Sequence, residues 1–399
     1  MLKSYEYRLY PNIEQQTLMA KHFGCVRFVY NYMLNHKTKI YETDKKNVNK
    51  FEMCSIVTQM KKQEEYSWLK EVNSQSLNVS IYNLEKAYTG FFRDKKGYPK
   101  FKSKYSKQSF ACPQFVTVDF ENNKISLPKF KTAIKCIFSR TFEGKIKTCT
   151  IKKTKTNKYF VSILVDDGLK EPQKPIITKE SAIGIDLGIR DFAILSNGNK
   201  IRNPKFYRNH EKRLKILQKR ASKKQKGSKN RQRANLKVAV LHEKIHNKRK
   251  DFIYKTIRYL FDKNQANTFC LENLNVSGML KNHKLAKHIQ DVSWSMFNQI
   301  LEGKCNLEGK NILRIGRFEP SSKTCSNCGH IMDKISLDTR KWECPKCHSS
   351  HDRDINAAKN IKQIALYKEF SGLGQPVEPV KMSELSESMK QESDCFSCR

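Results

Sequence analysis

The sequence carries Cys325-Ser326-Asn327-Cys328 and, separated from it by 15 residues, Cys344-Pro345-Lys346-Cys347. Each Cys-x2-Cys pair can bind one side of a tetrahedral Zn²⁺ through its two thiolates. Because all four ligands come from the chain, the spacing predicts a closed structural zinc site formed by Cys325, Cys328, Cys344 and Cys347. His330, His348 and His351 are near enough in sequence to replace a cysteine, but the cysteine spacing does not require them.

An acidic motif follows the second cysteine pair, in the segment His351-Asp352-Arg353-Asp354-Ile355-Asn356-Ala357-Ala358. Asp354 opens a predicted helix, in which Ala357 and Ala358 are small enough to permit close packing. A carboxylate in the first turn also stabilises a helix through its dipole, which is the structural alternative to a ligand role. Asp352 is the competing candidate, and we prefer Asp354 because it directly precedes the Ile355–Ala358 face.

Two apolar segments upstream each end in a carboxylate. Residues 181–188, Ser-Ala-Ile-Gly-Ile-Asp-Leu-Gly, place Asp186 at the end of a predicted strand, where Gly188 permits a tight turn. Residues 267–274, Asn-Thr-Phe-Cys-Leu-Glu-Asn-Leu, place Glu272 in the same way. Asp191 lies past the turn and is a weaker candidate. Taken alone, either acid is also compatible with an ordinary strand end.

Three carboxylates from separate segments can converge on one or two divalent ions. Mg²⁺ and Mn²⁺ prefer oxygen ligands, and they also bind phosphate oxygens. Two such ions about 4 Å apart can activate water and stabilise the leaving oxygen of an in-line displacement. The order strand-Asp, basic helices, strand-Glu, cysteine module, helix-Asp is more specific than any one of these acids, and it favours a shared divalent-metal site at Asp186, Glu272 and Asp354 that could act on phosphodiester bonds.

The net charge indicates a polyanionic partner. The chain has 399 residues, with 77 Lys and Arg against 39 Asp and Glu, and a formal charge of +38. A charge of this size attracts nucleic acid phosphates, and the alternative of a merely basic protein is disfavoured because the charge is also clustered. Hydrophobic residues make up 38% of the chain, enough for roughly two to four folded units.

The positive charge is concentrated in two segments. Residues 208–250 contain 17 Lys and Arg against two Glu, and Gly227-Ser228 interrupts an otherwise helical pattern, which predicts a basic helical hairpin. An anionic strand along the hairpin would relieve the repulsion, although a solvated helix pair is the alternative. Residues 97–104, Gly-Tyr-Pro-Lys-Phe-Lys-Ser-Lys, can stack on bases and hold phosphates, or form an ordinary solvated loop.

Cysteine usage and hydropathy favour an intracellular, soluble protein without a membrane partner. The 13 cysteines are odd in number and scattered outside the two pairs, which suits a reducing compartment better than a disulfide framework. Cys395 and Cys398 lack a second pair, and we assign them no function. The first residues contain no apolar signal segment, and no run approaches the roughly 20 apolar residues of a membrane span.

The N-terminal half combines predicted strands and helices. Residues 3–10 form a Tyr-rich strand, and Asn12 after Pro11 is a helix N-cap. Apolar residues at helical spacing follow, and two more helices are predicted near 50–62 and 75–94. Short strands are predicted at 116–120, 124–127, 148–153 and 159–165. We interpret these strands as a small β-barrel or sheet, followed by a linker at 167–180.

Together these residues resemble the TnpB family, small nucleases encoded by bacterial insertion sequences and related to the compact type V CRISPR effectors. The resemblance extends along most of the chain and ends at about residue 371. It rests on the opening Tyr-Arg-Leu-Tyr-Pro strand at 7–11 and on residues 97–104, 184–188, 271–274, 322–329 and 352–361. The last two segments in tandem are its most specific part.

The resemblance implies a multidomain α+β and α/β architecture. Residues 1–10 and 107–172 would form a wedge-type β-barrel, with a helical recognition insert at 11–106. Residues 173–322 and 349–370 would form an RNase H-like (RuvC) nuclease domain, including the basic segment 208–250. This domain would be interrupted by the zinc module at 323–348. Residues 371–399 lie beyond the resemblance, and their low hydrophobicity predicts a flexible tail.

The resemblance also implies an RNA-guided DNA endonuclease of the prokaryotic cytoplasm, associated with the nucleoid when it binds DNA. Its partners would be a guide RNA from the end of the element and target double-stranded DNA, cut beside a short adjacent motif. Asp186, Glu272 and Asp354 would bind Mg²⁺ (or Mn²⁺). Two alternatives stay open: an RNase H-like transposase that joins DNA strands, and a DNA-binding repressor without cleavage, which the intact acids disfavour.

Overall fold

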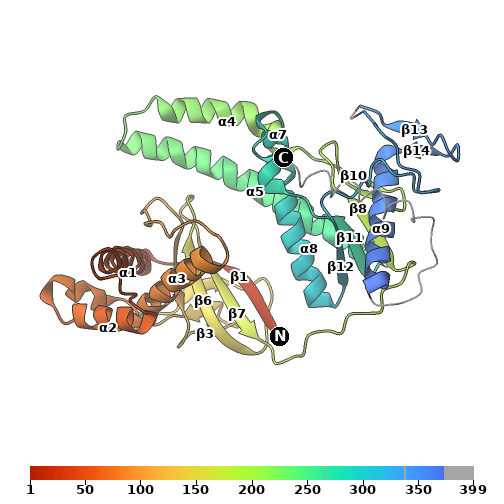
Figure 1. Ribbon diagram of the computed structural model, residues 1–399. Helices are drawn as coiled ribbons and strands as arrows, with labels where there is room; N and C mark the ends of the chain where they lie inside the picture. Colours follow the sequence, from red (N-terminus) through yellow and green to blue (C-terminus); the bar gives the residue numbers. More distant parts are fainter. Residues whose placement is uncertain (265, 337, 373–399) are drawn as a thin grey trace. The chain divides into compact units, whose positions relative to one another are not determined.

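The computed structural model describes residues 1–264, 266–336 and 338–372 (Figure 1). The chain divides into two compact units, Met1–Lys170 and Glu171–Arg399. The expectations for the tail beyond residue 372, including Cys395 and Cys398, lie outside the described residues. Within the described ranges, no helix has the length and apolar character needed to cross a membrane.

The first unit combines one sheet with a group of helices. Its strands are β1 (Leu2–Tyr10), β2 (Gln108–Cys112), β3 (Thr117–Asp119), β4 (Lys124–Ser126), β5 (Ile134–Ile137), β6 (Lys145–Lys153) and β7 (Tyr159–Asp166). Its helices are α1 (Ile13–Asp44), α2 (Lys50–Met60), the 3-10 helix η1 (Glu64–Glu71) and α3 (Ser74–Arg93). Asn12 caps α1 as expected, because its side chain accepts the backbone N–H of Gln15 at 2.8 Å.

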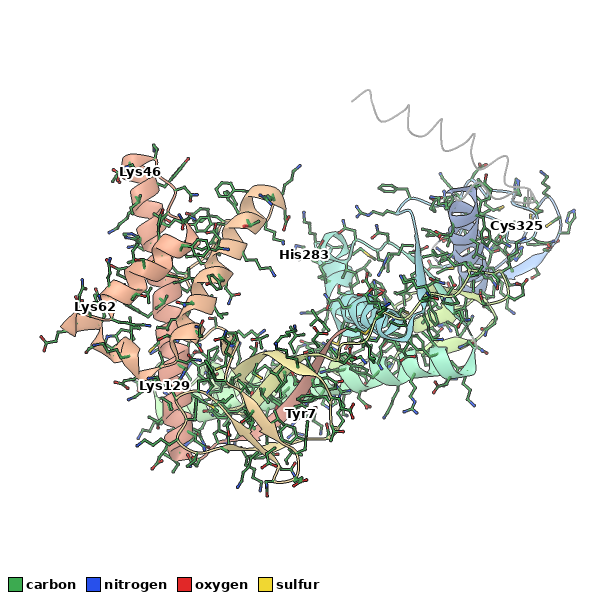
Figure 2. The ribbon with its side chains drawn as sticks, turned by 90° about the horizontal axis from the view of Figure 1, so that it is seen from below. Tyr7, Lys46, Lys62, Lys129, His283 and Cys325 are labelled. Carbon is green, nitrogen blue, oxygen red and sulfur yellow. The ribbon has the colours of Figure 1, made fainter. Side chains whose placement is uncertain are left out.

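The seven strands form an open antiparallel sheet in the order β2-β6-β7-β1-β5-β4-β3. The prediction of a closed barrel is therefore wrong, since no ladder among the described residues joins the edge strands β2 and β3. Strands β3 and β4 have only three residues each, too few to curl the sheet onto itself. Helices α1 and α3 pack on β2 and share one core with the strands, so helices bury the apolar face instead. Tyr7 of β1 lies inside this sheet (Figure 2).

The second unit contains a mixed five-stranded sheet. Its strands are β8 (Ala182–Asp186), β9 (Asp191–Leu195), β10 (Lys200–Arg202), β11 (Thr268–Glu272) and β12 (Asn311–Ile315). The order is β10-β9-β8-β11-β12, with β8, β9 and β10 antiparallel and with β11 parallel to both β8 and β12. The parallel strands β8 and β11 therefore end at the same edge of the sheet.

Helices cover both faces of this sheet (Figure 1). Helix α9 (Arg353–Gly372) packs on one face, where its residues share a core with Ala182 and Cys270. Helices α5 (Lys229–Lys263) and α8 (Trp294–Glu308) contribute to the core on the other face. The remaining elements are α4 (Phe206–Ser222), α6 (Val276–Met279), α7 (His283–Val292), β13 (Lys341–Glu343) and β14 (Ser350–Asp352).

The predicted basic hairpin is confirmed as the antiparallel pair α4 and α5, joined through Gly227 in the left-handed region (φ 84°). Helix α5 continues 13 residues beyond the predicted end at 250, because its second half carries apolar residues that pack on the sheet. Asp291 anchors the start of α4 by accepting the backbone N–H of Tyr207 at 2.8 Å and a guanidinium N–H of Arg249 at 2.7 Å.

Candidate active site

Strand alternation places Asp186 and Glu272 on the same face of the second sheet. Successive side chains of a strand point to opposite faces. Ile185 and Leu271 belong to the core beneath α5 and α8, so the acid that follows each of them lies on the face covered by α9. Because Ile185 is the register partner of Leu271, the two acids are neighbours at the ends of adjacent parallel strands.

Helix α9 approaches this edge closely because β8 has a glycine at the crossing. A Cβ at Gly184 would lie 2.0 Å from the carbonyl oxygen of Ala358, which is far inside van der Waals contact. Ala358 is buried at this contact, and the adjacent Ala357 is buried as well. The small residues on strand and helix therefore bring the first turn of α9, with Asp354, toward Asp186.

The three carboxylates share one electrostatic environment. The pKa of Asp186 is raised to about 7, first by burial and then by the negative charges of Glu272 and Asp354, while Arg353 opposes the shift. A cation at this position would relieve the repulsion between the three acids. Among the described residues, however, their carboxylate oxygens do not gather as closely as the ligand atoms of the cysteine cluster.

Asp352 and Asp354 have different surroundings. Asp352 is a helix cap, since its Oδ1 accepts the backbone N–H groups of Asp354 at 3.1 Å and Ile355 at 3.2 Å. Burial alone would raise the pKa of Asp352, but a hydrogen bond from Lys200 at 2.6 Å and these amides hold that pKa below its usual value. Asp354 instead contributes to the field at Asp186, and its Oδ1 lies 3.5 Å from a guanidinium nitrogen of Arg340.

A cleft of about 750 Å³ opens beside Asp354. Asp191, the weaker candidate, lines this cleft together with Asp352 and is not among the charges that raise the pKa of Asp186. The remaining lining is basic apart from Asn203 and comprises Arg190, Lys200, Arg202, Lys205, Arg340 and Lys341. A lining of this kind attracts phosphate groups toward one edge of the acid cluster.

The four predicted cysteines form one cluster. The sulfur atoms of Cys325, Cys328, Cys344 and Cys347 all lie within 4.8 Å of one another. Cys325 lies 3.7 Å from Cys347, and Cys328 lies 3.5 Å from Cys344, near the roughly 3.8 Å edge of a tetrahedron with Zn–S bonds of about 2.3 Å. The cluster lies beside α9 (Figure 2).

Both cysteine pairs close with the same turn. The N–H of Gly329 donates to the carbonyl of Cys325 at 2.9 Å, and the N–H of His348 donates to Cys344 at 2.8 Å. Gly329 and His348 both have left-handed φ angles, 78° and 55°. Of the three histidines considered as substitutes, His351 brings its side chain to a sulfur, with its Nε2 3.1 Å from Cys325, and the cluster found among the described residues contains cysteines alone.

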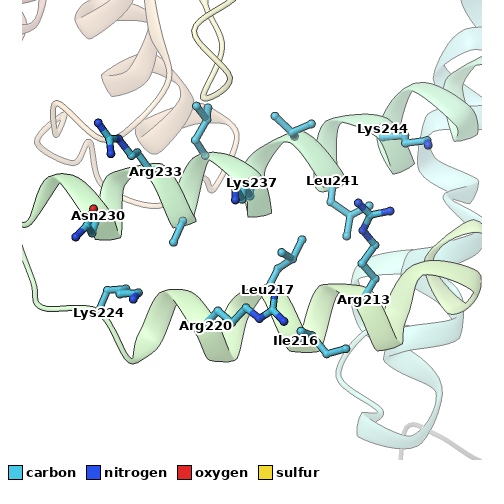
Figure 3. Close-up of a pocket in the computed structure, with 13 residues that line it drawn as sticks. Arg213, Ile216, Leu217, Arg220, Lys224, Asn230, Arg233, Lys237, Leu241 and Lys244 are labelled. Atoms are coloured by element: carbon cyan, nitrogen blue, oxygen red, sulfur yellow. The ribbon is translucent and has the colours of Figure 1, made fainter.

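A basic groove runs between α4 and α5 (Figure 3). Leu217 and Leu241 point toward each other and join the helices, whereas Ile216 and Val240 are about half exposed. The groove has a volume of about 980 Å³ and no acidic lining residue. Its cations are Arg213, Arg220, Lys224, Arg233, Lys237 and Lys244.

The aromatic-basic segment of the first unit is partly structural. Lys102 lies 3.6 Å from the centroid of the Tyr30 ring, and its backbone N–H donates to Asn31 at 2.8 Å. Tyr98 lies within hydrogen-bonding distance of Thr38, at 2.9 Å. These contacts fix the segment against α1, whereas the ring of Phe101 is exposed and therefore accessible to a ligand.

Comparison with known proteins places the chain in a family. The model OrfB_IS605, described as "Probable transposase", matches residues 162–283, and the Cas12f1-like TNB domain matches 294–361. A protein of Streptomyces pristinaespiralis, named for a predicted RNA-guided DNA endonuclease activity, is 36% identical over 98% of this chain and 96% of its own. InsQ of Escherichia coli K12, named in the same way, is 30% identical over 90% and 91%. The chain belongs to the TnpB family.

The fold of this TnpB-family chain is also similar to that of a solved complex. A Cas12f1 chain from a cryo-EM structure with single-guide RNA and target DNA superposes with a TM-score of 0.56 at 16% identity, covering 91% of this chain and 98% of the other. The model of a helix-turn-helix domain matches residues 1–46. In the structure, however, most of that segment is the single 32-residue helix α1.

Sequence reasoning about the TnpB-family motif overlooked two asparagines of α9, Asn356 and Asn360. Asn356 donates to the carbonyl of Thr324 at 2.7 Å and accepts the N–H of Ser326 at 2.9 Å. Asn360 donates to the carbonyls of Ser321 and Thr324 at 2.7 and 2.6 Å. The two side chains therefore fasten the first cysteine turn to the helix that carries Asp354. Polar residues at positions three and seven of a predicted, half-buried helix were the available signal.

Proposed function

We propose that this protein is an RNA-guided DNA endonuclease that hydrolyses phosphodiester bonds with divalent metal ions in the prokaryotic cytoplasm. One observation carries the proposal: Asp186 and Glu272 lie side by side at the ends of β8 and β11, beneath the helix turn that holds Asp354. Relatives that align over nine-tenths or more of the chain are named for this activity.

We infer that the second unit is an RNase H-like nuclease domain of the RuvC type, interrupted by the cysteine module. The mixed sheet supports this inference, because its central parallel strands present both acids toward α9. The division of the first unit into a wedge-type domain at 1–10 and 107–172 and a recognition insert at 11–106 is part of the same proposal. The grouping of α1, α2 and α3 between β1 and β2 supports it.

Asp186, Glu272 and Asp354 would hold Mg²⁺ or Mn²⁺, and their oxygen donors suit such hard ions. When bound, these ions supply an activated water and neutralise the charge that develops on the leaving oxygen. The raised pKa keeps Asp186 partly protonated near neutral pH. Binding of a cation would displace this proton. The basic cleft beside Asp354 would hold phosphates on either side of the bond to be cut.

We propose structural zinc at Cys325, Cys328, Cys344 and Cys347. The sulfur spacing suits tetrahedral thiolate coordination, and four protein ligands leave no open position for a substrate. The ion would stabilise the cysteine module, where the apolar cluster of the described residues consists of Trp342 and the cysteines with Met332 and Ile335 packed against them.

Guide RNA and target DNA are the proposed partners. The α4–α5 groove, with six cations and no acid in its lining, is suited to a sugar-phosphate backbone. The exposed Phe101 beside Lys100 and Lys104 suits stacking on an unpaired base. The Cas12f1 chain with a similar fold is a component of a complex with guide RNA and target DNA, and this supports the proposal.

Sequencing the RNA that copurifies with the protein from a host carrying its locus tests the proposal. We expect a discrete, protected RNA from sequence next to the gene, and Mg²⁺-dependent cleavage of DNA that matches it. Asp186→Ala should keep RNA binding and lose cleavage. Strand-transfer products without RNA would favour the transposase reading suggested by the description of the matching family model. Persistent DNA binding without cutting in Mg²⁺ would favour a repressor.

A further inference from the structure

Glu272 has a specific hydrogen-bond donor that is not a metal ligand. The hydroxyl of Ser321 donates to Oε1 of Glu272 at 2.6 Å. Hydrogen bonds between a hydroxyl and a carboxylate are charge-assisted and short, and they are stronger than bonds between neutral groups. This bond to Oε1 restricts the orientation of the carboxylate and so limits the directions in which its second oxygen can face. Ser321 is 6% exposed, so water competes little for its hydroxyl.

Ser321 is itself held in a fixed turn. The backbone N–H of Thr324 donates to the carbonyl of Pro320 at 3.1 Å, and the hydroxyl of Thr324 donates to the same oxygen at 2.8 Å. The amide of Asn360 donates to the carbonyls of Ser321 and Thr324. Asn360 is 2% exposed, and both of its partners are backbone oxygens, of which the carbonyl of Thr324 also accepts from Asn356.

The same turn leads directly into the cysteine cluster. Cys325 follows Thr324, and Asn356 fixes both neighbours of this cysteine through the carbonyl of Thr324 and the N–H of Ser326. One helix, α9, therefore carries Asp354 and also fixes the turn whose hydroxyl contacts Glu272. Helix α9 therefore positions residues of both the acid cluster and the cysteine cluster.

We propose that Ser321 is a positioning residue for Glu272. The cysteine cluster and α9 together hold the hydroxyl of Ser321 in place. The inference rests on the proposed function, because it treats Glu272 as a ligand of the catalytic ion. Groups that orient a metal ligand typically change metal affinity or activity by about 10–100-fold when they are removed. Loss of the Ser321 hydroxyl should therefore lower the affinity for the catalytic ion without removing any of its ligands.

The test measures Mn²⁺ binding to the full-length protein by electron paramagnetic resonance. Cleavage is measured in parallel. Ser321→Ala should weaken Mn²⁺ binding by about tenfold or more. Ser321→Cys, which keeps the size but is a poor donor, should resemble it, and Ser321→Thr should restore binding. Ser322→Ala is the matched control, since Ser322 is the adjacent half-buried serine and has no described bond to Glu272. Thermal unfolding and zinc content should be similar in all five proteins.

Glu272→Gln separates failure of the inference from failure of the proposed function. If Glu272→Gln abolishes tight Mn²⁺ binding and the Ser321→Ala and Ser321→Cys proteins bind like the wild type, the positioning role is wrong and the metal-site proposal stands. If Glu272→Gln binds Mn²⁺ normally, Glu272 is not a ligand and both proposals fall. A loss with Ser321→Thr as large as with Ser321→Ala would also contradict a role for the hydroxyl.

Discussion

The acid cluster and the cysteine cluster of the second unit both contain potential metal ligands, but they are built in opposite ways. The cysteines belong to one compact module, and their four sulfurs already lie within 4.8 Å of one another. The acids come from two strands and a helix far apart in the sequence, and burial together with repulsion between them raises the pKa of Asp186. A closed thiolate set suits a permanent ion, whereas separated carboxylates beside a basic cleft suit ions that arrive with a phosphate substrate.

Helix α9 makes the two clusters dependent on one another. It carries Asp354 in its first turn and fixes the first cysteine turn through Asn356 and Asn360. The two clusters therefore contact the same helix and differ in the chemistry of their ligands. Because α9 contacts both clusters, a change that disturbs the cysteine cluster should also disturb the acid cluster.

The largest effect should come from breaking the cysteine cluster. Cys325→Ser should lower the zinc content from about one ion per chain to near zero, because three thiolates bind structural zinc far less tightly than four. It should also lower the thermal unfolding midpoint and reduce cleavage through loss of the Ser321 turn. Elemental analysis and calorimetry measure the first two effects. Cys54→Ser, a half-buried cysteine of α2 outside the cluster, is the control; loss of zinc in that variant would contradict the assignment.

The next effect should come from separating α9 from β8. Gly184→Ala places a methyl group where the carbonyl of Ala358 now lies, so the helix must move. A displacement of about 1 Å at a catalytic group can cost about 100-fold in rate, and we expect a loss of that size in cleavage. Gly303→Ala in α8 is the control, because no atom lies within 4 Å of its added carbon. Equal rates for the two variants would show that the close approach is unimportant.

A smaller effect should appear in stability as a function of pH without divalent ions. The folded-state pKa of Asp186, about 7, exceeds the ordinary value of 3.8, so this group's favourable contribution is complete below about pH 4 and is lost as the pH rises through 7. Asp186→Asn should therefore gain stability relative to the wild type over this range, by roughly 2–4 kcal/mol. Chemical unfolding at pH 5 and pH 8 measures it. A constant difference between the two proteins would contradict the burial of a shared charge cluster, and added Mg²⁺ should reduce the gain.

The smallest effect should come from the α4–α5 groove, which lies outside both clusters. Lys237→Gln should weaken RNA or DNA binding severalfold at physiological salt and reduce the salt dependence by about one ion, with zinc and Mn²⁺ binding unchanged. Filter binding over a salt series measures this. Lys255→Gln is the control, because Lys255 pairs with Asp251 outside the groove. An equal loss in both variants would indicate a general charge effect.

Much of this arrangement could be predicted from the sequence because the signals are local. Cys325 and Cys328 form a turn in which neighbouring residues determine the geometry, so their spacing identifies the cluster. The apolar run before Asp186 predicts a strand, and the basic pattern from 208 to 250 predicts the two helices. The predicted strands at 124–127 and 159–165 are confirmed within one residue at each end.

Other features depended on contacts that no local pattern contains. Whether a set of antiparallel strands closes depends on how its edges meet, and here the three-residue strands β3 and β4 and the packing of helices on β2 leave the sheet open. Asn360 was overlooked because its partners are backbone carbonyls more than 30 residues away. The sequence favoured Asp354 over Asp352 only through its position before the Ile355–Ala358 face, because helix capping and ligand roles favour the same residue type.

The most direct test of the acid cluster compares two isosteric changes two residues apart in the RNA-loaded protein. Asn caps a helix as well as Asp does, so Asp352→Asn should keep the start of α9 and retain most of the Mg²⁺-dependent DNA cleavage. Asp354→Asn should reduce cleavage to background while guide RNA binding and zinc content stay unchanged. Cleavage that survives Asp354→Asn, or that is lost only with Asp352→Asn, would contradict the proposed catalytic site.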